Sequence, residues 1–111
     1  MRPYELVIIF DADLDDDAIR SIVDRTLEQI RSGDGEPGRV DHWGKRRFAY
    51  ELKHRWEGYY VVAQAKAEPD TIAGVDRALS LMDEVLRHRI VRIPEEVYGA
   101  EAAPAVAASE E

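Results

Sequence analysis

The alternation of two hydrophobic periodicities along the chain constrains its fold more than any other feature. Residues 6–10, Leu-Val-Ile-Ile-Phe, form a short β-branched and aromatic run that is typical of a strand buried in the middle of a sheet. Residues 19–30 then follow the three-and-four spacing of an amphipathic helix, with apolar side chains at Ile19, Ile22, Val23, Leu27 and Ile30. Asp15, Asp16 and Asp17 suit the N-terminal cap and dipole of this helix. Residues 32–38, which hold three Gly and one Pro, end it.

Two further strand-like runs, a second helix and a last strand follow. Residues 40–50 are aromatic and basic, and residues 58–67 are rich in Tyr, Val and Ala, so each run predicts a strand. The polar segment 53–57 is short enough for a hairpin, which makes these strands antiparallel. Pro69 opens a helix and residues 85–93 predict the last strand. The helix has one apolar face, made of Ile72, Val75, Leu79 and Met82.

This order, β-α-β-β-α-β, is that of the ferredoxin-like or split βαβ fold, an α+β architecture with a four-stranded antiparallel sheet and two helices on one face. The other sheet face is then left open. If Leu6 and Ile8 point toward the helices, alternation sends Val7 and Ile9 to the open face. On the third strand, either the even-numbered residues from Tyr60 or their odd-numbered neighbours face outward.

The last strand also divides into two faces. Arg87, Arg89 and Val91 share one of them, and the opposite one carries Leu86, His88 and Ile90. Because the second set is more apolar, we expect it to face the helices.

Charge is distributed unevenly along the chain. The net charge is -8, but residues 94–111 hold five Glu and no Lys or Arg, while the other 93 residues hold 15 basic and 18 acidic side chains. Residues 39–56 contain six basic and two acidic side chains. The Ala- and Glu-rich segment 95–111 lacks the apolar periodicity needed for packing, so the sequence predicts a domain over 1–94 and a mobile acidic tail over 95–111.

No constellation of residues indicates catalysis, a cofactor or a metal. His42, His54 and His88 fall on different predicted elements, and the chain contains no Cys. The Asp cluster over 11–17 does not match a calcium loop, and helix capping explains it better. No apolar run approaches the roughly 20 residues needed to cross a bilayer. We therefore expect a cytoplasmic binding protein with no membrane segment and no small-molecule substrate.

The most informative segment is 43–50, Trp-Gly-Lys-Arg-Arg-Phe-Ala-Tyr, where three consecutive cations are interleaved with three aromatic residues. Arg can clamp a phosphate, and exposed aromatic rings can stack on unpaired RNA bases. The alternative is an edge strand whose charges prevent aggregation, with Phe48 and Tyr50 in the core.

Besides this segment, the chain has the opening Met-Arg-Pro-Tyr-Glu and the run Gly-Tyr-Tyr at 58–60. With these three motifs, residues 1 to about 93 resemble the bacterial small-subunit ribosomal protein six family. Members of this family are ferredoxin-like domains that bind the central domain of 16S ribosomal RNA as a heterodimer with ribosomal protein eighteen. The resemblance therefore implies a structural component of the ribosome and not an enzyme. One departure is Glu51, which follows Tyr50 where the family usually has Pro.

The resemblance and the charge pattern together predict two sets of contact residues. The expected RNA-contacting residues are Arg2, Tyr4, Lys45, Arg46, Arg47, Lys53, Arg55, Arg87, Arg89 and Arg92. The open sheet face is expected to meet the partner protein through Val7, Ile9, Tyr60 and Val62.

Two other classes of protein share this fold. One is a dimeric regulatory or ligand-sensing module, which would use Val7, Ile9 and Val62 as its dimer seam. The other is a hydrolase of the acylphosphatase type, which needs an Asn to hold phosphate. The chain contains no Asn, and this counts heavily against the hydrolase.

Overall fold

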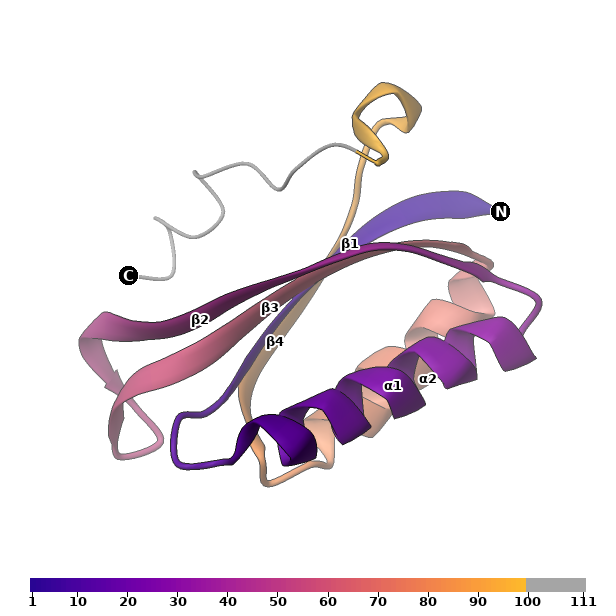
Figure 1. Ribbon diagram of the computed structural model, residues 1–111. Coiled ribbons are helices and arrows are strands. Elements are labelled where there is room, and N and C mark those ends of the chain that lie inside the picture. The colour runs from indigo at the N-terminus through magenta and orange to yellow at the C-terminus, as the bar shows by residue number, and fades with distance from the viewer. Residues whose placement is uncertain (100–111) are drawn as a thin grey trace.

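The computed structural model describes residues 1–99, and the predicted tail beyond Gly99 lies outside the described residues. The elements are β1 (Arg2–Asp11), α1 (Asp16–Ser32), β2 (Glu36–Leu52), β3 (Arg55–Ala67), α2 (Pro69–Ser80), β4 (Val85–Arg92) and the short 3-10 helix η1 (Glu95–Val97). The strands form one antiparallel sheet in the order β2-β3-β1-β4, and both helices lie on the same face of it (Figure 1). The predicted α+β, ferredoxin-like fold is confirmed.

The main core lies between the sheet and the helices. Leu6, Ile8 and Phe10 of β1 are buried against apolar side chains of both helices, as the alternation of β1 predicts. The side chain of Asp15 accepts a hydrogen bond of 2.8 Å from the backbone N–H of Ala18, which confirms the predicted cap of α1. Within residues 1–99, no helix combines the length and apolar character needed to span a membrane.

Three local predictions need correction. Pro37 lies inside β2 and does not break the chain before it; β2 is an edge strand, where a missing backbone N–H is tolerated. The β2–β3 turn is the dipeptide Lys53-His54 and not the segment 53–57. Both turn residues have positive φ, 46° and 65°, as a two-residue hairpin of type I′ requires. Met82 follows the end of α2 but still packs against the main core.

The sheet face opposite the helices carries a second, smaller core. Trp43, Phe48 and Leu52 of β2 pack over apolar side chains of the neighbouring strands, which are Val7, Ile9, Tyr60, Val62 and Leu86. The rings of Trp43 and Tyr60 are stacked, with centroids 6.5 Å apart and an interplanar angle of 12°. Phe48 is only 5% exposed. The expected open face is therefore covered at this end by the protein itself.

A β-bulge and a glycine make this cover possible. Trp43 and Phe48 are five residues apart, so in a regular strand they would point to opposite faces. The pairing of β2 with β3 shifts between His42 and Gly44, and Gly44 has a φ of 86° that favours glycine. The shift places both aromatic side chains on the same face.

The two faces of β4 follow the prediction except at one residue. Arg87 pairs with Ile9 and Arg89 pairs with Val7, so both arginines lie on the face of the second core. Leu86 was expected to face the helices, but it belongs to the second core. The reason is an irregularity between Ile9 and Phe10 in their pairing with β4, which adds one residue to β4 and reverses the direction of Leu86.

Residues 95–99 fold back onto the other end of the same face. Lys66 Nζ lies 2.6 Å from a carboxylate oxygen of Glu95 and 4.9 Å from the centre of the Tyr98 ring. The backbone N–H of Gly99 donates a hydrogen bond of 2.6 Å to Oε1 of Gln64. The packed part of the chain thus reaches Gly99, five residues past the predicted domain boundary at Pro94.

Candidate nucleic-acid interface

Three consecutive cations lie on the outer edge of the sheet. Lys45, Arg46 and Arg47 are all exposed on β2, and they pair in register with residues 57–59 of β3. Because neighbouring residues point to opposite faces, Arg46 lies on the side of the second core, with its guanidinium carbon 5.8 Å from the centre of the Trp43 ring. Lys45 and Arg47 point to the other side. The edge strand therefore presents positive charge on both of its sides.

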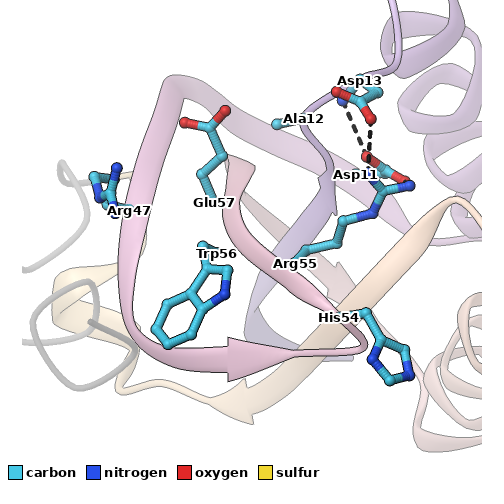
Figure 2. A pocket seen from close by; sticks show the side chains of 8 residues that line it. All are labelled: Asp11, Ala12, Asp13, Arg47, His54, Arg55, Trp56 and Glu57. Carbon is cyan, nitrogen blue, oxygen red and sulfur yellow. Dashed lines mark hydrogen bonds and ion pairs between the residues drawn. The ribbon is translucent and has the colours of Figure 1, made fainter.

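From Arg47, the last of these cations, the β2–β3 hairpin continues as an arm. The arm comprises residues 47–57, because β1 ends its pairing opposite Gly58 and the arm strands pair only with each other. Two residues of the arm that were predicted to contact RNA make contacts within the protein. Lys53 Nζ donates to the backbone carbonyl of Val85 at 3.4 Å. Arg55 forms ion pairs with Asp11, the last residue of β1, and with Asp13 of the β1–α1 loop, shown in Figure 2.

The remaining predicted RNA contacts lie on β1 and β4. Arg87, near the arm, donates a hydrogen bond of 3.1 Å to the hydroxyl of Tyr50. Arg2 and Arg92 are exposed at the opposite end of the sheet, where Tyr4 pairs with Arg92. Tyr4 is half-buried against the main core. Arg89 is exposed between the two ends.

The ten predicted residues therefore form two groups and not one patch. Lys45, Arg46 and Arg47 lie near the end of the sheet where Phe10 pairs with Tyr59. Tyr4 precedes Phe10 by six residues of β1, a separation of about 20 Å along an extended strand. A single contact surface that includes Arg2 and Arg47 would have to run the length of the sheet.

The four predicted partner-binding residues are all buried within the chain. The exposed fraction is 2% for Val7, 1% for Ile9, 0% for Tyr60 and 1% for Val62. Trp43, Phe48 and Leu52 of the bulged edge strand β2 pack against them in the second core. Binding of a partner remains a prediction, but in this conformation other side chains would have to make the contact.

Two exposed aromatic residues of the arm were not among the predicted contacts. Trp56 is 52% exposed and Tyr50 is 43% exposed. The exposure of Trp56 has a sequence signal, since it stands within the polar run 53–57. The alternative prediction for the segment 43–50 placed Phe48 and Tyr50 in the core, which is right for Phe48 and wrong for Tyr50. No sequence signal connects Arg55 with Asp11 and Asp13, which are more than 40 residues away.

An open, polar hollow of ≈ 320 Å³ lies between the arm and the β1–α1 loop. It is lined by Asp11, Ala12, Asp13, Arg47, His54, Arg55, Trp56 and Glu57 (Figure 2). In the figure, Arg55 points toward the two aspartates, whereas Trp56 and His54 point away from them. Among residues 1–99, no three side chains of His, Cys, Asp or Glu gather closely enough to hold a metal ion.

A buried acid lies on the same sheet face as the second core. Glu5 is 6% exposed and pairs in register with Gln64, which is 4% exposed. Burial disfavours the charged carboxylate and raises the pKa of Glu5 above its ordinary value of 4.5, although a hydrogen bond from the Gln64 side chain acts in the opposite direction.

This burial makes the free energy of unfolding depend on pH. The folded protein binds the Glu5 proton more tightly than the unfolded chain, so stability falls as pH rises through the window that begins near 4.5. Glu5→Gln keeps the shape of the side chain without its charge. We expect this variant to have a higher midpoint of thermal unfolding than the parent at pH 7, with the difference vanishing below the window. Glu96→Gln, at an exposed position, serves as the control. A variant less stable than the parent at pH 7 would contradict this account of Glu5.

Comparisons with known proteins agree over nearly the whole described chain. Residues 3–92 match the model of the family described as ribosomal protein S6. The small ribosomal subunit protein bS6 of Streptomyces griseus is 41% identical over 92 residues, which cover 83% of this chain and 96% of that relative. The bS6 protein of Carboxydothermus hydrogenoformans is 44% identical with the same coverage.

One solved structure gives the same result. The crystal structure of 30S ribosomal protein S6 from Thermotoga maritima matches with a TM-score of 0.78 at 25% identity, over 83% of this chain and 87% of that one. The C-terminal domain of MgtC from Mycobacterium tuberculosis, with a TM-score of 0.61 at 14% identity, shares the fold alone. From the family match, the curated relatives and the structure of a family member, it follows that this chain belongs to the bacterial ribosomal protein S6 family of the small ribosomal subunit.

Proposed function

We propose that the protein binds the central domain of 16S ribosomal RNA in the bacterial cytoplasm, together with ribosomal protein eighteen, and acts as a structural component without enzymatic activity. The proposal of RNA binding rests on the run of exposed cations at residues 45–47 on the outer edge of the sheet. An edge strand can approach a phosphate backbone without rearrangement of the core. Its cations would position the protein on folded RNA and would not read a sequence.

The net charge of -8 argues against tight RNA binding by the isolated chain. Binding to RNA depends largely on the release of counterions by Lys and Arg, and a protein with excess negative charge gains little from long-range attraction. The local field of residues 45–47 would act only at short range. A basic partner would supply the rest of the positive field, which favours joint binding over binding by the isolated chain.

We propose that the partner contacts the arm and the outer surface of the second core. Trp56 and Tyr50 are the large exposed aromatic side chains of the arm, and aromatic residues are enriched in protein interfaces. The dimeric regulatory module loses support from the same geometry, because its seam of Val7, Ile9 and Val62 is buried inside the chain.

The test measures binding to an RNA transcript of the central domain at several salt concentrations, with and without purified ribosomal protein eighteen. We expect weak binding by the chain alone, much tighter binding with the partner, and a steep loss of affinity as salt rises. A transcript of equal length from another domain of the same RNA is the control. Equal affinity for both transcripts in the presence of the partner would refute the proposal.

A further inference from the structure

The arm depends on side-chain contacts for its orientation. Its two strands pair with each other, Arg47 with Glu57 and Leu52 with Arg55, and neither pairs with β1. A two-stranded ribbon is at best marginally stable by itself. On the side of the second core, the arm is held by the packing of Phe48 and Leu52. Toward β4, the contact of Lys53 with Val85 and the hydrogen bond between Arg87 and Tyr50 add to this.

On the other side, Arg55 connects the arm to the β1–α1 loop. Its two terminal nitrogens bind different aspartates, Nη2 at 3.1 Å from Oδ2 of Asp11 and Nη1 at 2.7 Å from Oδ2 of Asp13 (Figure 2). The backbone N–H of Asp13 donates a hydrogen bond of 3.0 Å to Oδ1 of Asp11, which holds the Asp11 carboxylate against the backbone of Asp13. The planar guanidinium is suited to this double contact.

We infer that Arg55 is a positioning residue: with Asp11 and Asp13 it forms an ionic clamp that fixes the direction in which the arm leaves the sheet. The inference rests on the proposed function, because Arg47 and the proposed partner contacts Tyr50 and Trp56 lie on the arm, so its direction determines where they meet RNA and the partner. It also replaces the predicted role of Arg55 as an RNA contact. Two carboxylates already balance its charge, so its guanidinium attracts a phosphate less than an arginine without acidic neighbours would.

A clamp and a purely electrostatic effect predict opposite changes in RNA affinity when the two aspartates lose their charge. Asp11→Asn together with Asp13→Asn removes two negative charges near the proposed RNA surface. Electrostatics alone predicts tighter RNA binding from this change. A clamp predicts weaker binding, because the arm then occupies its binding orientation for a smaller fraction of the time. We expect affinity for the central-domain transcript, measured with ribosomal protein eighteen present, to fall about three- to tenfold, as the loss of two partly exposed ion pairs would produce.

Asp24→Asn together with Asp34→Asn is the matched control. Both residues are exposed outside the clamp, and the pair changes the net charge by the same amount. We expect it to bind RNA as tightly as the parent or slightly more tightly. Arg55→Lys keeps the positive charge but cannot reach both carboxylates with a rigid fork, so it should also weaken binding. A direct phosphate contact would instead retain most of its effect in Arg55→Lys.

A second measurement needs no RNA. Hydrogen exchange of the backbone amides of residues 47–57 is expected to speed up in the Asp11→Asn, Asp13→Asn variant and to stay unchanged in the control, while the amides of α1 keep their protection in both. Faster exchange of the arm would support the clamp even if the parent protein failed to bind the transcript, so failure of the proposed function would be visible separately. Unchanged exchange of the arm, or RNA binding at least as tight as in the control, would overturn the inference.

Discussion

Replacing Lys45, Arg46 and Arg47 together by alanine is expected to weaken joint assembly on the central-domain RNA by about 10- to 100-fold at physiological salt. The three side chains are exposed on an edge strand and face both of its sides, so they can reach phosphates without displacing any core residue. Each phosphate contact contributes roughly 0.7 to 0.9 to the slope of log affinity against log salt. The triple variant should therefore also lower this slope by about 2 to 3.

A control must reproduce the change in net charge. Arg20→Ala, Arg25→Ala and Arg77→Ala remove three exposed cations from α1 and α2, on the helical face of the molecule. If only total charge mattered, both triple variants would lose the same affinity. We expect the helix variant to retain most of its binding and its salt slope. An equal loss in both variants, or an unchanged slope in the edge variant, would remove residues 45–47 from the RNA interface.

The fold could be predicted because it follows from local patterns. The apolar spacing of α1, its Asp15 cap and the alternation of Leu6, Val7, Ile8 and Ile9 each depend on residues close in sequence, and the structure agrees with all three. The order of the elements then leaves few possible topologies. The exposed cations of β2 could be predicted as well, because a dense run of Lys and Arg is rarely buried.

The interior of the second face could not be predicted in this way. Whether Val62 is open or covered depends on the face to which Trp43 points, and that direction depends on a one-residue bulge between His42 and Gly44. A bulge reverses the direction of the side chains that follow it, so a small local irregularity changes which residues are buried. Leu86 lies in the second core, and not on the predicted helix face, because of a similar irregularity in the pairing of β1 with β4.

The ion pairs of Arg55 were missed for a different reason. Its partners lie at the end of β1 and in the β1–α1 loop, and the sequence shows only that Asp residues are frequent there. The Asp cluster was explained by helix capping, which is right for Asp15 but not for Asp11 and Asp13. Ion pairs across such a distance in sequence become visible only once the hairpin has been placed beside the loop.

A large loss of stability is expected from a charged substitution in the buried second core. Val62→Glu would be a surface change if this face were open, and the protein would keep its fold and its cooperative unfolding. Val62 is instead 1% exposed and belongs to the second core, so a glutamate there would bury a charged carboxylate among apolar side chains. Such a substitution is expected to lower the free energy of unfolding by about 4 kcal/mol or more. For a domain of this size, that corresponds to a fall of roughly 15 to 30 °C in the midpoint of thermal unfolding.

The chain offers a matched control for this substitution. Val97 is 41% exposed, so Val97→Glu makes the same chemical change at the surface and is expected to alter stability by no more than about 0.5 kcal/mol. Thermal unfolding followed by circular dichroism compares the two variants with the parent. If Val62→Glu unfolded like Val97→Glu and lost only its pairing with ribosomal protein eighteen, the residues under Trp43 and Phe48 would be accessible after all. The cover formed by β2 would then have to open in solution, and the partner would bind to the sheet itself.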